Sequence, residues 1–160
     1  MTAVLRDDRQ LMPMTVTELD AVMAIERAAY EFPWTRGNFL DSLHAGYDAR
    51  VLADRGTGLL GYFVALHGVD EMHLLNLTVA PTRQGEGHAR CMLQGLVGLC
   101  RERQALQLWL EVRESNQRAR ALYLRFGFRH VGSRRGYYPA SGGRREDAVV
   151  MTLDIPGDNP

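Results

Sequence analysis

Residues 106–127 read LQLWLEVRESNQRARALYLRFG, and they predict the feature on which the fold depends, a strand followed by a helix. The strand is indicated by apolar residues at every second position from Leu106 to Val112, which would share one face of a sheet. Trp109 and Glu111 stand between them and would point to the opposite face. A carboxylate held rigidly at the end of a strand is a candidate general base. The structural alternative for Glu111 is a solvated or ion-paired carboxylate.

The helix that follows can begin at Ser115 or at Asn116, because either side chain can cap its free N–H groups. Gly127 suits the left-handed position at the end of a helix. Asn116 and Tyr123 lie seven positions apart, which places them on one helical face. A phenol with a pKa near ~10 can protonate a departing group and stay neutral at pH 7, so Tyr123 is a candidate general acid. Core packing is the alternative role for this tyrosine.

A second informative segment, VAPTRQGEGHA at residues 79–89, lies between an apolar strand and a helix predicted at about 89–103. Gly85 and Gly87 allow the backbone to approach a ligand closely. Free N–H groups at the start of the helix favour an anion such as a pyrophosphate. A plain strand-to-helix turn is the equal alternative, because glycine is common in loops.

The rest of the chain predicts a mixed α/β sheet with antiparallel strands at both ends and one crossover helix between the strands at Leu74 and Leu108. Thr17 and Asp20 form a candidate capping box for a helix reaching about Tyr30. The other expected elements are a short helix from Thr35 to about Leu43, strands at about 50–54, 59–67, 70–79, 129–137 and 148–153, and a turn at 55–58.

Length and composition limit what the chain can be. With 160 residues and 46% apolar content, it can bury one core, so we expect a single domain over 1–160, with its core at about 10–155 and loose tails. Nineteen basic residues, all arginine, balance nineteen acidic ones, which argues against nucleic-acid binding. No apolar run approaches the ~20 residues that span a bilayer, so no membrane association is expected.

Cys91 and Cys100 lie nine positions apart on the predicted helix and would face opposite ways, so they cannot pair with each other. Without a secretory signal, this usage of cysteine favours a reducing, cytoplasmic location. The histidines show no spacing typical of metal ligands, and no metal is expected.

Together the two segments resemble the GNAT family of acetyl-CoA-dependent N-acetyltransferases. Gln84, Gly87 and Ala89 fit that family's Q/R-x-x-G-x-G/A loop. Further stretches resemble the RimI-type subgroup, which acetylates the N-terminal alanine of a small-subunit ribosomal protein. They are FPW (32–34), DEMHLLNLTV (70–79), WLEVRESN (109–116), ALY (121–123), GF (127–128), RRGYYP (134–139) and REDAVVM (145–151). The resemblance covers about residues 17–155.

The resemblance implies a role for each candidate residue. Glu111 would be the general base and Tyr123 the general acid. Acetyl-CoA would be the cosubstrate, held by Leu77, Thr78, Val79, Gln84, Gly85, Glu86, Gly87, His88, Ala89, Arg90 and Asn116. The acceptor would meet Phe32, Trp34, Glu71 and Tyr138. A protein N-terminus would be the partner, without nucleic acid or membrane.

Several expectations stay open at this point. Partial burial could raise the pKa of Glu111, and His73 is an alternative base. Glu86 would repel a pyrophosphate unless its side chain points to solvent. The stretch 140–145, ASGGRR, carries an extra residue and an added arginine that could shift peptide preference. The competing functions are an acetyltransferase for small amines or polyamines and a non-catalytic acetyl-CoA-binding module.

Overall fold

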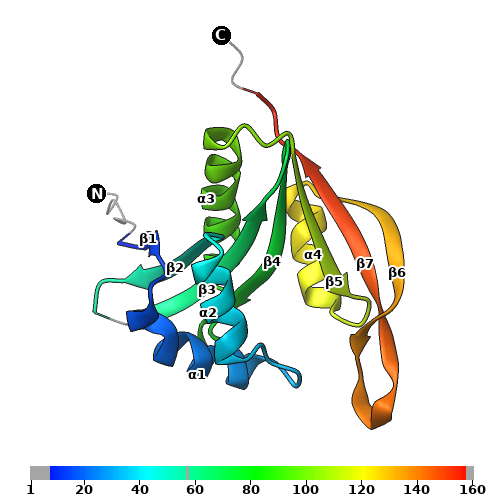
Figure 1. Cartoon of the computed structure of the whole chain (residues 1–160), viewed down its shortest axis with the longest axis horizontal. Coiled ribbons are helices and arrows are strands. Elements are labelled where there is room, and N and C mark those ends of the chain that lie inside the picture. Colours follow the sequence, from blue (N-terminus) through cyan, green and yellow to red (C-terminus); the bar gives the residue numbers. More distant parts are fainter. Residues whose placement is uncertain (1–7, 57, 158–160) are drawn as a thin grey trace, which may run out of the picture.

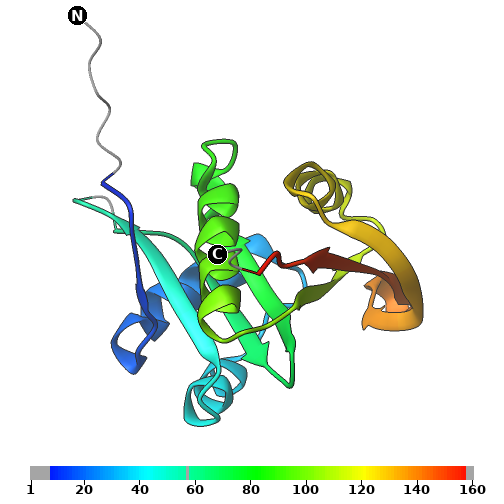
Figure 2. The same ribbon diagram turned by 90° about the horizontal axis from the view of Figure 1, so that it is seen from above.

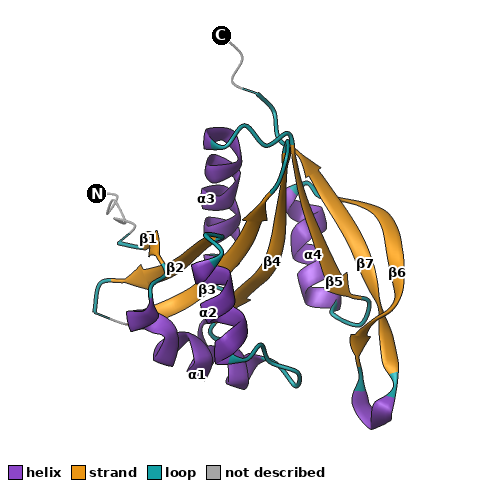
Figure 3. Cartoon of the chain, viewed as in Figure 1, coloured by secondary structure: helices purple, strands orange, loops and turns teal. Residues whose placement is uncertain are grey.

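A computed structural model of the chain describes residues 8–56 and 58–157 (Figure 1). Seven strands form one sheet in the order β1-β2-β3-β4-β5-β7-β6. The strands are β1 Gln10–Pro13, β2 Asp48–Asp54, β3 Gly58–His67, β4 Glu71–Val79, β5 Gln107–Arg113, β6 Arg129–Pro139 and β7 Arg145–Asp154. The helices are α1 Leu19–Ala29, α2 Arg36–His44, α3 His88–Glu102 and α4 Gln117–Phe126, with short 3-10 turns at Val16–Glu18, Pro81–Arg83 and Ser141–Gly143 (Figure 3).

All neighbouring strands are antiparallel except β4 and β5, which are parallel and connected by α3. The prediction of a mixed, mostly antiparallel sheet with four helices and a central crossover is therefore confirmed. α1 and α2 pack on one face of the sheet, while α3 and α4 belong to the cluster on the other face. Figure 2 shows α4 beside β6 and β7, far from α1 and α2.

Strand β3 shows how the sheet separates two cores. Tyr62 and Val64 pack with α1 and α2, whereas Phe63 and Ala65 pack with α3 and β5. This alternation follows from the two-residue period of a strand, and residues 60–65 are all buried because both faces are covered.

Strand β4 contains a bulge that sets which side chains reach each face. Asn76 pairs with Val64 while Leu74 pairs with Ala65, so Leu75 has no partner on β3. One extra residue reverses the alternation beyond it. As a result, Asn76 and Thr78 face α1.

Three local predictions need correction. Helix α1 is entered through a capping box of Thr15 and Glu18, not Thr17 and Asp20, because the chain first makes a 3-10 turn at Val16–Glu18. Leu106 does not share the buried face with the other apolar residues, since it precedes β5 and its side chain is 58% exposed. β1 was missed, because four residues ending in proline show no clear strand pattern.

Several predictions are met or lie outside the described residues. Leu108, Leu110 and Val112 share the buried face of β5 as expected. β6 and β7 run further than predicted and pair as far as Pro139 and Arg145. The expected tails at 1–7 and 158–160, and position 57 of the turn, lie outside the described residues. Among the described residues, no helix is both long and apolar enough to cross a membrane.

Candidate active site

The site lies where β4 and β5 part. These strands pair from Glu71–Gln107 to Leu74–Leu110 and then diverge towards their C-terminal ends (Figure 1). Glu111 stands one residue beyond the last pair, and residues 75–79 of β4 run along the other side of the gap. A parallel pair that opens in this way frees backbone N–H and C=O groups of both strands for a ligand.

A cavity of about 670 Å³ opens on this gap. Ten of the eleven predicted cosubstrate residues line it: Leu77, Thr78, Val79, Gln84, Gly85, Gly87, His88, Ala89, Arg90 and Asn116. Tyr123 lines it too. Residues that sequence reasoning missed complete the wall: Ala29, Tyr30, Arg118, Ala119, Leu122, Arg125 and Phe126. Of those on α4, Ala119 and Phe126 share the helical face of Asn116 and Tyr123, a signal that the 3.6-residue period carries.

The glycine-rich loop has the backbone that its sequence requires. Gly85 and Gly87 adopt φ angles of +80° and +84°, a conformation that favours glycine. A Cβ at Gly87 would meet no atom within 4 Å, so the backbone angle and not crowding demands glycine there. Gly87 directly precedes α3, whose first N–H groups are free to bind an anion. Gln84 accepts a hydrogen bond of 2.8 Å from Arg118, which ties the loop to α4.

Glu86 is the one predicted cosubstrate residue that does not line the cavity. Its carboxylate lies 2.9 Å from Arg83 Nε and 2.9 Å from His88 Nε2, and the hydrogen bonds from His88 and Arg83 hold its pKa below the usual value. Its carboxylate is therefore paired within the loop, which reduces the repulsion considered for a pyrophosphate.

Glu111 is nearly buried, with 9% of its side chain exposed, and it forms a hydrogen-bonded pair with His73 of β4. Arg134 Nε lies 3.7 Å from its other oxygen. Burial acts to raise the pKa of Glu111, but the hydrogen bond and charge of His73 and the charge of Arg134 outweigh burial and lower it. The possibility that burial raises this pKa is therefore not met, because His73, which the sequence offered as an alternative base, and Arg134 both act against burial.

Tyr123 is buried, and its ring meets Phe128 edge to face at 5.5 Å between centroids. Burial raises the pKa of its phenol, and the neighbouring Tyr30 adds to this effect. Among the described residues, no hydrogen-bond partner is found for its hydroxyl group, so its proton is free for a ligand. Asn116, not Ser115, caps α4 by accepting from the Ala119 N–H at 3.1 Å.

The acceptor side is formed by the loop after α1 and the β6–β7 hairpin. The Arg113 guanidinium carbon lies 5.4 Å from the ring centre of Phe32 and 4.6 Å from that of Tyr138. Ser141 donates a hydrogen bond of 2.8 Å to Glu31, so loop and hairpin also meet directly. Phe32 and Tyr138 therefore border the same space as Glu111, whose charge raises the pKa of Tyr138 after the larger effect of burial.

Two predicted acceptor residues lie elsewhere. Trp34 packs against Phe39 with 5.1 Å between ring centroids, as part of the core beneath α1 and α2. Glu71 is the exposed first residue of β4, four residues from the opening and hence about 13 Å away along the strand. The structure does not bring Glu71 together with the other site residues.

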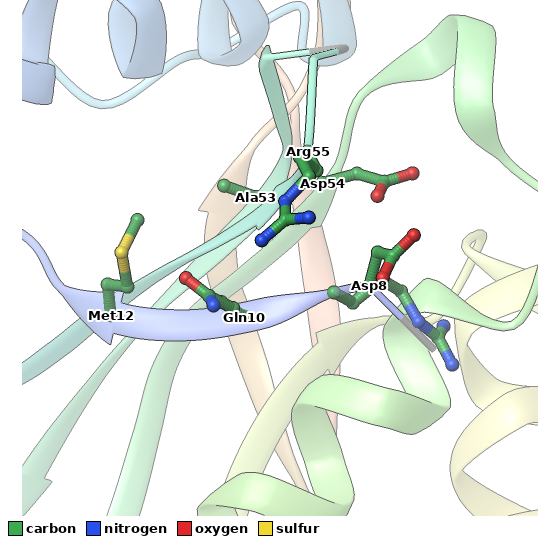
Figure 4. Close-up of a pocket in the computed structure, with 7 residues that line it drawn as sticks. Asp8, Gln10, Met12, Ala53, Asp54 and Arg55 are labelled. Carbon is green, nitrogen blue, oxygen red and sulfur yellow. The ribbon is translucent and has the colours of Figure 1, made fainter. Parts of the chain in front are cut away.

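A second cavity of about 490 Å³ lies beside β1 and the end of β2, lined by Asp8, Arg9, Gln10, Met12, Ala53, Asp54 and Arg55 (Figure 4). None of the predicted site residues lines it. Among the described residues, no group of three or more side chains is arranged to hold a metal ion.

The chain is similar to known N-acetyltransferases in sequence. The sequence model of the acetyltransferase (GNAT) family matches residues 19–128. The [ribosomal protein bS18]-alanine N-acetyltransferase of Escherichia coli K12 is 37% identical over 142 residues, which cover 89% of this chain and 95% of the relative. The enzyme of the same name from Haemophilus ducreyi is 36% identical over 141 residues, which cover 87% of this chain and 97% of the relative.

Two solved structures are similar to the chain in fold. The crystal structure of the ribosomal-protein-S18-alanine N-acetyltransferase from Escherichia coli superposes with a TM-score of 0.84 at 35% identity, covering 95% of this chain and 98% of that chain. Ard1 from Thermoplasma volcanium shares the fold, with a TM-score of 0.82 at 21% identity, covering 93% of this chain and 99% of that chain.

Proposed function

The chain belongs to the acetyltransferase (GNAT) family, and on this premise we propose that it acetylates the N-terminal alanine of a small-subunit ribosomal protein with acetyl-CoA as cosubstrate. Membership of the family makes the chain an acetyl-CoA-dependent N-acetyltransferase. The observation that carries the finer proposal is the identity of 36–37%, over nearly the whole chain, to relatives named for this activity. A ribosomal protein as substrate is in keeping with an enzyme of the cytoplasm.

In the proposed mechanism, the α-amine attacks the thioester carbonyl, so that a C–N bond forms and the C–S bond breaks. Glu111 takes one proton from the amine nitrogen. An N-terminal amine has a pKa of ~7.7–8.0, against ~10.4 for lysine, so a carboxylate with a lowered pKa remains a sufficient base for it. The lower pKa of the α-amine therefore makes it easier for this base to deprotonate than a lysine side chain.

Tyr123 gives its proton to the departing thiolate and is reprotonated from solvent. Three features support this role: it lines the cavity, its hydroxyl has no partner among the described residues, and its raised pKa keeps the phenol protonated at neutral pH. The N–H groups at the start of α3 and the loop from Gln84 to Arg90 bind the pyrophosphate, and free N–H groups near Leu77 to Val79 polarise the carbonyl oxygen.

The proposal is tested by comparing acetyl transfer to three acceptors: a peptide that starts with Ala-Arg, the same peptide with a blocked N-terminus and an internal lysine, and spermidine. We expect transfer to the first to exceed transfer to the others by at least tenfold in kcat/KM. Because the chain has no lysine, acetylation of its own lysine side chains cannot add to the signal. Faster transfer to spermidine or to the blocked peptide would refute the proposal.

A further inference from the structure

Glu26 of α1 is a buried carboxylate, 1% exposed, on the same side of the sheet as Glu111. Its Oε1 accepts hydrogen bonds from the Tyr62 hydroxyl at 2.6 Å and from Asn76 Nδ2 at 3.0 Å. Its Oε2 accepts from the backbone N–H of Trp34 at 2.9 Å. Three neutral donors thus satisfy this carboxylate inside the fold.

The carboxylate determines the orientation of Asn76. Because an ionised carboxylate only accepts hydrogen bonds, the amide nitrogen of Asn76 must face Glu26 and its carbonyl oxygen must face the other way. That oxygen accepts a hydrogen bond of 2.7 Å from the Thr78 hydroxyl. The single hydroxyl proton of Thr78 is therefore donated to Asn76 and is not available to another acceptor.

Tyr30 comes next in this chain of hydrogen bonds. Its hydroxyl lies 2.6 Å from Thr78 Oγ1 and 3.4 Å from the carbonyl oxygen of Leu77. Since the Thr78 proton points to Asn76, Tyr30 must be the donor of the short contact. Burial raises the pKa of Tyr30 to about 12, so the phenol holds this proton at neutral pH.

Tyr30 also lines the cosubstrate cavity, together with Leu77, Thr78 and Tyr123. Its proton is used within the fold, so its hydroxyl oxygen can only accept a hydrogen bond from a ligand. Hydrogen bonds in such a chain polarise one another, and the charge of Glu26 at its end makes the Tyr30 oxygen a better acceptor. The two cavity tyrosines are therefore opposites: Tyr123 has a free proton, and Tyr30 offers a lone pair.

We propose that the Tyr30 oxygen binds acetyl-CoA by accepting a hydrogen bond from the pantetheine amide N–H nearest the sulfur. Pantetheine carries two amide N–H groups, and its thioester end must lie near Tyr123 for that residue to protonate the sulfur. Tyr30 and Tyr123 line the same cavity, so we assign to Tyr30 the amide nearer to the sulfur. Glu26, Asn76 and Thr78 are positioning residues that orient Tyr30. The inference rests on acetyl-CoA as cosubstrate and not on the identity of the acceptor.

The test measures acetyl-CoA affinity by calorimetry for wild type and Tyr30→Phe. A single hydrogen bond contributes about 0.5–1.5 kcal/mol, so Kd should rise by about 2- to 13-fold. Two analogues then locate the bond, each with one pantetheine amide nitrogen replaced by oxygen. Wild type should bind the analogue altered next to the sulfur more weakly, and Tyr30→Phe should bind it as well as it binds acetyl-CoA.

Tyr47→Phe is the matched control, because it removes a phenol oxygen from the turn before β2, outside the cavity. A second variant covers the case in which Tyr30→Phe does not fold. Thr78→Val removes the oxygen that accepts the Tyr30 proton, so it should also weaken acetyl-CoA binding. Thr78→Ser keeps the hydroxyl and should lose less acetyl-CoA affinity.

Any of four results would overturn the proposal. Tyr30→Phe could bind acetyl-CoA with the Kd of wild type, or it could lose as much affinity for the near-amide analogue as for acetyl-CoA. Tyr47→Phe could lose as much acetyl-CoA affinity as Tyr30→Phe, or Thr78→Val could bind acetyl-CoA as tightly as wild type. Acetyl-CoA binding is measured without the peptide that accepts the acetyl group. Failure to acetylate the Ala-Arg peptide would therefore count against the proposed function and leave this inference standing.

Discussion

Two carboxylates on one side of the sheet, the buried Glu26 and the partly buried Glu111, are bound in opposite ways. Glu26 is 1% exposed and accepts hydrogen bonds from three neutral groups. Glu111 has a side chain 9% exposed and meets two ionisable groups, His73 and Arg134, whose side chains are 31% and 55% exposed.

The difference separates a carboxylate of the scaffold from the carboxylate that we propose as the base. The partners of Glu26 are fixed by the packing of α1 on β3 and β4, and they cannot leave without disturbing that packing. The two side chains that meet Glu111 are partly exposed, so they can move without disturbing the core. A base must exchange partners in each turnover, and this exposure fits Glu111 to the proposed role.

The largest effect is expected for Glu111→Gln, which should lower turnover with the Ala-Arg peptide by about 10²- to 10⁴-fold at pH 7. Acetyl-CoA affinity should hold, because Glu111 does not line the cosubstrate cavity. The loss should shrink as pH rises towards ~8, where more of the amine is already neutral. Steady-state kinetics and calorimetry test both points, and full activity below pH 7 would transfer the role of base to His73.

A pair of tyrosine variants extends the comparison. Tyr123→Phe should lower turnover by about 10- to 10⁴-fold with little change in melting temperature, because it removes only an unpaired hydroxyl. Tyr62→Phe should instead lower the free energy of unfolding by about 1–3 kcal/mol, since it deletes a hydrogen bond to the buried charge of Glu26. Kinetics and denaturant unfolding of both variants test whether each variant loses turnover or stability. Wild-type turnover in Tyr123→Phe would leave that residue with a packing role only.

Glu26→Gln should destabilise the fold by about 2–3 kcal/mol, because the new amide places N–H groups against donors that the carboxylate accepted from. Glu111→Gln should cost less than about 1 kcal/mol, since its partners can turn to solvent. Urea unfolding of the two variants compares them directly. Equal losses would show that the two carboxylates do not differ as described.

The smallest effect concerns acid stability. The folded-state pKa of Glu111 is lowered from its usual 4.5, so its contribution to stability is present above that value and is lost as pH falls through the folded pKa. Between pH 6 and pH 3, the melting temperature of wild type should therefore fall slightly more than that of Glu111→Gln. Parallel curves for the two proteins would mean that His73 and Arg134 do not stabilise the carboxylate.

The candidate site was predictable from sequence where its residues are close in the chain. The glycine-rich turn and the shared helical face of Asn116 and Tyr123 follow from glycine positions and spacing, whereas the resemblance supplied the other residues of the loop from Gln84 to Arg90. The structure places all of them except Glu86 on one cavity. Glu71 and Trp34 were assigned by resemblance alone, and they lie away from that cavity. The capping box was assigned two residues too late, because a 3-10 turn precedes α1.

By itself the sequence determined the helices, every strand except β1 and the glycine-rich turn, because backbone period and turn chemistry depend on neighbours within a few residues. Only the tertiary structure decided the electrostatics. It brings His73 to Glu111 across 38 positions and Asn76 to Glu26 across 50, through the strand order and the bulge at Leu75. A one-residue change in register would send Asn76 and Thr78 to the other face. No local pattern could therefore show which carboxylate accepts neutral donors and which one faces the reaction.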